Sequence, residues 1–136
     1  MQIASEKGVF MSQLKAVSPI FAVDNVVSSA EYYRDKLGFS VFVLSETVPF
    51  ASVERDAVSI HLLQATTEGA RNSVAQVAGH SCDLYIRITN ADELFAEMKF
   101  RGAQIHQDIG DQPYEMRDFS VQDCNGYILT FGHPLF

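Results

Sequence analysis

The chain carries the same order of predicted elements twice, and this internal duplication limits its fold more than any single motif. Each half reads as a strand, a helix that ends at a glycine, and three further strands. Val23 corresponds to Ile88, and Gly38 to Gly102, at nearly the same offset. A single βαβββ unit leaves one face of its small sheet exposed, so two units are expected to pair. The sequence therefore predicts an α+β fold in which paired βαβββ modules form a curved mixed sheet with a cleft.

The first module is predicted to span residues 14–64. Its strands are expected at residues 16–23, 39–44, 50–54 and 58–64. Ser28 and Glu31 have the spacing of a capping box at the start of the helix, and Gly38 can end that helix in a left-handed conformation. The apolar stripe of the helix comprises Ala30, Tyr33 and Leu37.

The second module is predicted to span residues 82–133 and to follow the same plan. Its strands are expected at residues 83–88, 103–109, 116–123 and 126–132. Asn90 and Glu93 indicate the start of the helix, and the Asp123–Gly126 tetrapeptide predicts a tight hairpin. The apolar stripe of this helix comprises Leu94, Phe95 and Met98.

Two further segments complete the domain organisation. Residues 65–81 are rich in Thr, Gly, Ser and Ala and are predicted to link the modules. Residues 1–13 are predicted to be an N-terminal arm, disordered or exchanged with a partner. The folded unit is then one domain over residues 14–133.

Composition excludes several classes of protein. With 47% hydrophobic and 20% charged residues, the 136-residue chain can fill a core, so general disorder is not expected. The net charge of −7 argues against nucleic acid as a partner, because phosphate binding requires clustered Lys and Arg. The same charge serves solubility or favours a cationic ligand.

Localisation is predicted from cysteine use and hydropathy. Cys82 and Cys124 lack the spacing of a metal site, so free thiols in a reducing, cytoplasmic setting are the simpler interpretation. Glu6, Lys7 and Gln13 interrupt any apolar run of the kind that a secretory signal has. No run approaches the ~20 apolar residues that span a bilayer, so no membrane association is predicted.

Three passages resemble the vicinal oxygen chelate superfamily, also called the glyoxalase/bleomycin resistance/dioxygenase family. VDNVVSSAEYYRDKLGF at residues 23–39 is similar to its opening V-x-D-hydrophobic-x-x-S-x-x-F/Y-Y-x-x-x-L-G-F. MRDFSVQDCNGY at residues 116–127 is similar to its closing M-R-E-F-x-V-x-D-P-x-G-N hairpin, and residues 90–94 with 101–103 resemble its second helix and exit. The resemblance covers residues 16–133.

Within this family the chain looks most like the bleomycin-resistance branch, because a long segment at residues 109–114 runs into the closing hairpin. Cys124 and Tyr127 depart from the usual Pro and Asn of that hairpin. The resemblance implies a homodimer with ligand crevices between modules or subunits.

Catalytic members of the family hold a divalent metal on His and Glu side chains from several strands. By resemblance, three of those positions fall on Ser18, Asp83 and Thr130, and a fourth falls near Ile60 or His61. Hydroxyl groups and one carboxylate compete poorly with water for a divalent ion. The sequence therefore predicts neither a metal nor another cofactor, and no catalytic residue.

The residues predicted to line a ligand crevice come from both modules: Phe42, Phe50, His61, Asp83, Tyr85, Arg87 and Phe119. Asp83, Tyr85 and Arg87 share one face of a strand and could orient a polar ligand, or Asp83 and Arg87 could form a surface pair. His61 either makes a hydrogen bond on a half-buried strand or lines the pocket. Aromatic walls with an acidic cleft would suit a flat or cationic molecule.

The sequence leaves three possible functions open. The first is a metal-independent small-molecule binding protein that sequesters a cationic or aromatic antibiotic, as the resemblance implies for bleomycin-type resistance. The alternative is a metal-dependent lyase, isomerase or dioxygenase of the same superfamily. The third is a protein-association module that uses its acidic faces.

Overall fold

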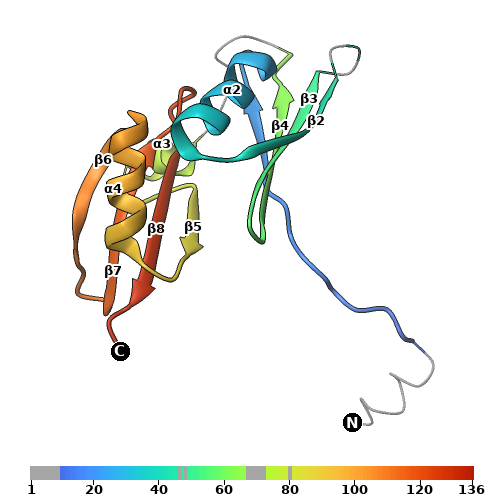
Figure 1. The fold of residues 1–136 in the computed structure, drawn as a ribbon. Helices are drawn as coiled ribbons and strands as arrows, with labels where there is room; N and C mark the ends of the chain where they lie inside the picture. The colour runs from blue at the N-terminus through green and yellow to red at the C-terminus, as the bar shows by residue number, and fades with distance from the viewer. Residues whose placement is uncertain (1–9, 46, 48, 67–72, 80) are drawn as a thin grey trace.

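The protein consists of two four-stranded mixed sheets, each packed on one face against a helix (Figure 1). The computed structural model describes residues 10–45, 47, 49–66, 73–79 and 81–136. The first module contains β1 (Ile20–Val23), α2 (Val26–Leu37), β2 (Ser40–Ser45), β3 (Phe50–Arg55) and β4 (Val58–Gln64). The second contains β5 (Leu84–Arg87), α4 (Ala91–Arg101), β6 (Gln104–Asp111), β7 (Met116–Gln122) and β8 (Ile128–Pro134).

The sheets have equivalent topologies, β1-β4-β3-β2 and β5-β8-β7-β6. In each, the first strand pairs in parallel with the last, and the other neighbours are antiparallel. This confirms the predicted α+β class and the pairing of two βαβββ modules. Within the described residues the two modules form separate sheets, and β1 and β5 each lie at an edge.

An asparagine caps each of the two longer helices. The side chain of Asn25 accepts a hydrogen bond from the Ser28 N–H at 2.9 Å, and Asn90 accepts one from the Glu93 N–H at 3.1 Å. The predicted Ser28–Glu31 capping box is therefore wrong: α2 begins three residues earlier, and Ser28 supplies a backbone donor instead of the cap. Asparagine is well suited to this position because its short side chain reaches the orphan N–H groups.

The helices end as the duplication predicts. Gly38 and Gly102 have φ values of 75° and 85°, the left-handed conformation that glycine adopts without a Cβ clash. Tyr33, Leu37 and Met98 are fully buried, so the predicted stripes face the core. The α2 stripe is buried along its whole length, whereas Leu94 and Phe95 of α4 are only partly covered.

The closing hairpin of the second module packs against the first module. Asp123 forms the predicted turn, since its Oδ1 accepts from the N–H groups of Asn125 at 2.8 Å and Tyr127 at 2.9 Å. Its Oδ2 accepts from the hydroxyl of Tyr33 in α2 at 2.7 Å. The carboxylate of Asp123 therefore joins the hairpin to the helix of the other module.

Tyr127 adds a second link between the modules. Its ring stacks on Phe21 of β1 with centroids 4.1 Å apart, and its hydroxyl donates to the carbonyl of Ala22 at 2.7 Å. The Tyr at this position, a departure from the family's usual Asn, thus buries an aromatic ring at the junction. Arg55 and Glu97 form a further link through two hydrogen bonds of 2.9 and 2.7 Å.

The segments outside the modules differ from the expectation in one respect. A short helix, α3 (Val74–Ala78), lies in the predicted linker, for which no helix was predicted. Residues 10–19 run away from the sheets without regular structure (Figure 1), and residues 1–9 of the predicted arm lie outside the described residues. In the part of the chain that the structure describes, no helix is both long and apolar enough to cross a bilayer.

Candidate functional site

The second module has a hollow of about 750 Å³ against the sheet face that α4 does not cover. Tyr85, Thr130 and Ser120 stand side by side across β5, β8 and β7, because the strand register pairs Tyr85 with Thr130 and Thr130 with Ser120. All three line the hollow, as does Tyr114 from the turn between β6 and β7. Its wall therefore consists mainly of hydroxyl and amide groups, with Gln76, Gln107 and Gln122 among the latter.

Asp118 lies behind two of these hydroxyls. It stands two residues before Ser120 on β7, on the same face, and its side chain is completely buried. The hydroxyls of Tyr85 and Tyr114 donate to its Oδ2 at 2.9 and 2.6 Å. Asp118 itself does not line the hollow: its buried carboxylate lies behind the wall, held by two of the phenols that do.

Two polar atoms beside these phenols have no hydrogen-bond partner among the described residues. They are Oδ1 of Asp118 and the hydroxyl oxygen of Ser120, both fully buried. A buried polar atom without a partner costs free energy, of the order of 1–3 kcal/mol. The cluster can therefore accept further hydrogen bonds.

Both phenols stay protonated at neutral pH. Burial first, and then the hydrogen bond to Asp118, raise the pKa of Tyr114 to about 12. The same two causes raise the pKa of Tyr85 well above its ordinary value. Tyr114 is 58% exposed overall, yet its hydroxyl is the end that lies against the carboxylate.

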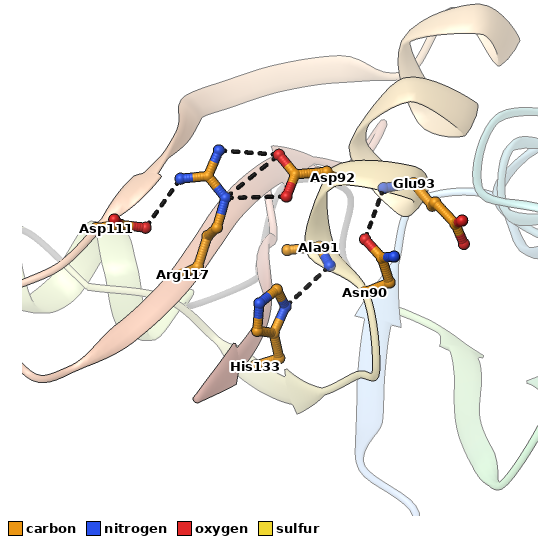
Figure 2. A network of polar contacts seen from close by, with 7 residues as sticks. All are labelled: Asn90, Ala91, Asp92, Glu93, Asp111, Arg117 and His133. Carbon is orange, nitrogen blue, oxygen red and sulfur yellow. Dashed lines mark hydrogen bonds and ion pairs between the residues drawn. The ribbon is translucent and has the colours of Figure 1, made fainter. Parts of the chain in front are cut away.

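Arg117 precedes Asp118 in β7 but lies on the opposite face of the sheet. Figure 2 shows its guanidinium between Asp92 of α4 and Asp111 of β6, with an Nη atom 2.9 Å from each. Nearby, Nδ1 of His133 accepts from the N–H of Ala91 at 3.0 Å, at the start of α4. These contacts join the helix to the strands, so Arg117 and His133 have structural roles.

The corresponding face of the first module is more apolar. Ile20 pairs with His61 and His61 with Ser52, as Tyr85 pairs with Thr130 and Thr130 with Ser120 in the second module. Ile20 and Leu63 remain 63% and 43% exposed. This register also answers the ambiguity at the fourth strand, because Ile60 is fully buried while His61 lies on the open face.

The structure places the predicted aromatic and imidazole residues of the first module together only in part. Phe50 and His61 meet edge to face, with ring centroids 5.1 Å apart. Phe42 lies on the edge strand β2 and is 72% exposed. His61 is thus a half-buried strand residue in contact with an aromatic ring.

Asp83 fits neither of its two predicted roles directly. Its Oδ2 accepts from the Ile128 N–H and the Ser73 hydroxyl, each at 2.8 Å, and its Oδ1 accepts from the Val74 N–H. The carboxylate therefore fixes the start of α3 and of β8 instead of pairing with Arg87. This role of Asp83 could not be predicted, because the sequence did not indicate the helix whose start it holds.

The other predicted residues of the second module divide between the two faces of its sheet. Tyr85 lines the hollow described above, and Arg87 lines a separate one of about 450 Å³ between the modules. Phe119 is fully buried between Phe95 and Phe131, at centroid distances of 5.2 and 5.4 Å. Phe119 is one residue from both Asp118 and Ser120, so its side chain lies on the opposite face of the sheet, against α4, and outside the candidate site.

Residues 15–131 match the model of the Glyoxalase/Bleomycin resistance protein/Dioxygenase superfamily. The chain belongs to this superfamily. The match covers most of the chain and includes both modules, so it confirms the resemblance that the opening and closing motifs indicated.

Sequence relatives lie in the bleomycin-resistance branch of the superfamily. The chain is 29% identical over 125 residues to the bleomycin resistance proteins of Geobacillus stearothermophilus and Staphylococcus aureus, which covers 83% of this chain and 92% of theirs. This agrees with the branch that the sequence predicted.

Solved structures share the fold. The bleomycin-binding protein of Streptomyces verticillus, solved with copper(II)-bleomycin, superposes with a TM-score of 0.67 at 22% identity, covering 89% of this chain and 97% of that one. TioX from Micromonospora sp. ML1 gives a TM-score of 0.69 at 17% identity, covering 90% and 100%.

The side chains at the superfamily's metal positions do not suit a divalent ion in this chain. Thr130 offers only a hydroxyl, and the carboxylate of Asp83 is engaged by two backbone N–H groups and a hydroxyl. Among the residues that the structure describes, no three side chains of His, Cys, Asp or Glu gather as metal ligands would. No step of a mechanism is therefore derived through a metal.

Sequence reasoning missed three members of this candidate site: Asp118, Tyr114 and Ser120. Alternation along β7 does place Asp118 and Ser120 on one face, but it does not show which face of the sheet carries a hollow. Tyr114 comes from a turn, and no periodicity brings its hydroxyl to a carboxylate four residues later. A glycine within the last strand was the one available sign of a close approach there. Gly132 lies opposite Asp118 in the register of β7 and β8, and it leaves room for the Tyr85 hydroxyl.

Proposed function

We propose that this protein binds a small organic molecule without metal chemistry, and that it protects by sequestering a cationic or aromatic antibiotic. The observation that supports this most is the hollow of the second module, whose wall includes several hydroxyls and amides and has the buried Asp118 carboxylate behind two of its phenols. Sequestration requires only affinity and enough copies of the protein, so no transition state has to be stabilised. The likeness to bleomycin resistance proteins supports bleomycin as the first ligand to test.

The proposed mode of binding uses the difference between the two faces. The first-module face offers Ile20, Leu63 and the Phe50–His61 pair, which suit apolar and aromatic parts of a ligand. The second-module face offers hydroxyls near a negative charge, which suit a polar or cationic part. Ligand pockets commonly combine apolar walls with a few polar groups that fix orientation.

We further propose that the protein acts as a homodimer. Apolar side chains along residues 10–20 support this, since Leu14 is fully exposed and Val17 is 87% exposed in the extended segment (Figure 1). Exposed apolar surface of this kind marks an interaction site. A second copy that covers this segment and the face of β1 would bury it, and ligand crevices would then lie between subunits. Analytical ultracentrifugation tests the dimer, and a purely monomeric protein at 50 µM, roughly the concentration of a routine run, would refute it.

A reducing, cytoplasmic setting is part of the proposal. Cys82 and Cys124 are the only cysteines of the chain, and neither forms a disulfide. Disulfides are rare where thioredoxin and glutathione keep thiols reduced.

Isothermal titration of the purified protein with metal-free bleomycin tests the function. Saturable binding near one ligand per chain is expected, and absence of saturation at low salt and micromolar protein would refute the drug-binding proposal. Elemental analysis of the same preparation separates the enzyme alternative. Stoichiometric Zn, Ni, Mn or Fe would favour a metal-dependent lyase, isomerase or dioxygenase.

A further inference from the structure

We propose that the carboxylate of Asp118 is the point at which this protein recognises a protonated amine, with the oxygens of Tyr85, Tyr114 and Ser120 as the surrounding acceptors. This inference rests on the proposed small-molecule binding and names the chemical group that the second-module hollow selects. It adds Asp118, Tyr114 and Ser120 to Tyr85, the one member of this cluster that the sequence predicted to line a crevice.

The charge balance around Asp118 supports a cation. The carboxylate is completely buried, and no described Lys or Arg forms an ion pair with it. Arg87 lies on the same face of the sheet, two strands away across Gly132, but makes no ion pair with Asp118. Two acidic side chains of this module, Asp92 and Asp111, do have such a partner in Arg117. The buried Asp123 has three hydrogen-bond donors, whereas Asp118 has two phenol donors to one oxygen and, among the described residues, none to the other. A buried anion is costly unless a positive group or several donors compensate it. A ligand ammonium would supply the missing positive charge.

The hydrogen-bond inventory also favours a donor-rich ligand. A phenol has one proton, and both Tyr85 and Tyr114 give theirs to Oδ2 of Asp118. Their oxygens therefore have only lone pairs left to offer. With Oδ1 of Asp118 and the Ser120 oxygen also unpartnered, the inner end of the hollow is rich in acceptors. An ammonium group, which has three N–H donors and no acceptor when primary, is the complement of such a surface.

The cluster is packed as a built site. Tyr85 lies over Gly132, and a Cβ added to that glycine would collide with the Tyr85 hydroxyl and come within 2.8 Å of the Asp118 Cβ. Glycine at this position thus leaves the space that the Tyr85–Asp118 hydrogen bond occupies. The inner wall is held by the β-sheet itself.

Access comes from the side of Tyr114. This residue belongs to the turn between β6 and β7 and is 58% exposed, whereas Asp118 and Ser120 are fixed in β7. A transient rotation of the Tyr114 side chain toward solvent would admit a ligand without moving the sheet, and its return would place the phenol oxygen as an acceptor beside the bound ammonium. Tyr114 is therefore the exchangeable partner of Asp118, and Tyr85 the fixed one.

A pair of small probes isolates the charge. We would titrate ¹⁵N-labelled full-length protein with benzylamine and with benzyl alcohol, which match in size and aromatic ring but differ in charge. Benzylamine should shift the amide signals of residues that line the hollow, and benzyl alcohol should bind at least about tenfold more weakly, as expected when a charged hydrogen bond is lost. Equal affinity of the two probes would overturn the proposal.

Variants then locate the charge. Asp118→Asn keeps the size of the side chain and should weaken benzylamine about tenfold or more, while Glu31→Gln, an exposed position on α2, removes the same charge and should change nothing. Tyr114→Phe serves if Asp118→Asn does not fold, because this residue lies at the surface; it should weaken benzylamine several-fold. Unchanged benzylamine affinity in a folded Asp118→Asn, or in Tyr114→Phe, would show a merely structural cluster and refute the proposal.

The same variants separate this inference from the proposed function. If wild-type protein and Asp118→Asn bind bleomycin equally, small-molecule binding stands and the amine-recognition proposal fails. If bleomycin does not bind but benzylamine binds through Asp118, the drug proposal fails and amine recognition stands.

Discussion

The hydrogen bond from Tyr33 to Asp123 is a sensitive point of the fold, because it joins two modules and ends on a buried carboxylate. Tyr33 is fully buried and Asp123 only 2% exposed. The Tyr33 hydroxyl is the sole described donor to Oδ2, at 2.7 Å, while backbone N–H groups serve Oδ1. Tyr33→Phe therefore leaves a buried carboxylate oxygen without its donor.

We expect Tyr33→Phe to lower the free energy of unfolding by about 2 kcal/mol at pH 7, within the range for hydrogen bonds to charged groups. For a chain of this length, that loss corresponds to a decrease in Tm of about 7 °C. Tyr127→Phe is the matched control. Its hydroxyl is similarly buried at the same junction and donates over the same 2.7 Å, but to the neutral carbonyl of Ala22. The control should lose about 1 kcal/mol.

The difference between the two variants should depend on pH. Burial raises the pKa of Asp123 above its ordinary value of 3.8, and the Tyr33 hydrogen bond opposes this increase. The folded state therefore holds its proton more tightly than the unfolded chain, so stability falls as the pH rises from about 4 through the folded pKa. Tyr33→Phe raises the folded pKa further, which makes the variant lose more stability over this pH range than the wild type does.

Urea unfolding followed by far-UV circular dichroism measures these differences, since the chain has no tryptophan and the substitution alters tyrosine emission. The cost of Tyr33→Phe should be about 1 kcal/mol at pH 4 and about 2 kcal/mol at pH 7. The cost of Tyr127→Phe should stay constant. If both costs are equal and independent of pH, Asp123 does not carry a buried charge and the reasoning is refuted.

Three other predictions concern separate parts of the fold. Arg55 first, and Arg101 to a lesser degree, hold the pKa of Glu97 at about 2, so Glu97→Gln should cost about 1 kcal/mol at pH 7 after allowance for solvent screening. That cost should vanish as the pH falls from about 4.5 toward 2, because the ionised Glu97 becomes protonated and its ion pairs no longer stabilise the fold. A difference in urea midpoint between Glu97→Gln and the wild type that stays constant with pH would contradict this. Asn90→Ala should cost about 1 kcal/mol of unfolding free energy by urea titration, and Asn90→Ser should restore most of it; equal losses would exclude capping. Gly132→Ala should lower stability by roughly 1–3 kcal/mol and weaken benzylamine, since the new Cβ displaces Tyr85; a Tm equal to the wild type would show that the site relaxes freely.

The duplication and its helices were predictable because they depend on local patterns. Asn90 and Gly102 carry signals within a few residues of the helix ends that they specify. The hairpin at Asp123–Gly126 is local in the same sense. The helix start was predicted three residues too late because Ser28 also fits a capping pattern. Asn25 is the cap instead, and its side chain accepts a hydrogen bond from the Ser28 N–H.

The contacts that define the site depend on depth and distance, which periodicity does not encode. Alternation assigns Phe119 to one face and Asp118 to the other, but it does not say which face is covered by a helix. Asp83 looked free in sequence, and only the turn of α3 shows that three donors already hold it. Tyr114 reaches its carboxylate because the chain reverses direction between β6 and β7.

The duplication also shows where function separates the two modules. Each module presents its open face through the same register, so Ile20 and Leu63 correspond to Tyr85 and Gly132. The backbone beneath the two faces is equivalent, so they differ only in their side chains. The face of the first module exposes aliphatic side chains. In the second module, two phenols donate to a buried carboxylate, and a glycine leaves room for one of them. That carboxylate is buried with two phenol donors and no positive partner among the described residues, and the ammonium ligand that we propose would supply the positive charge.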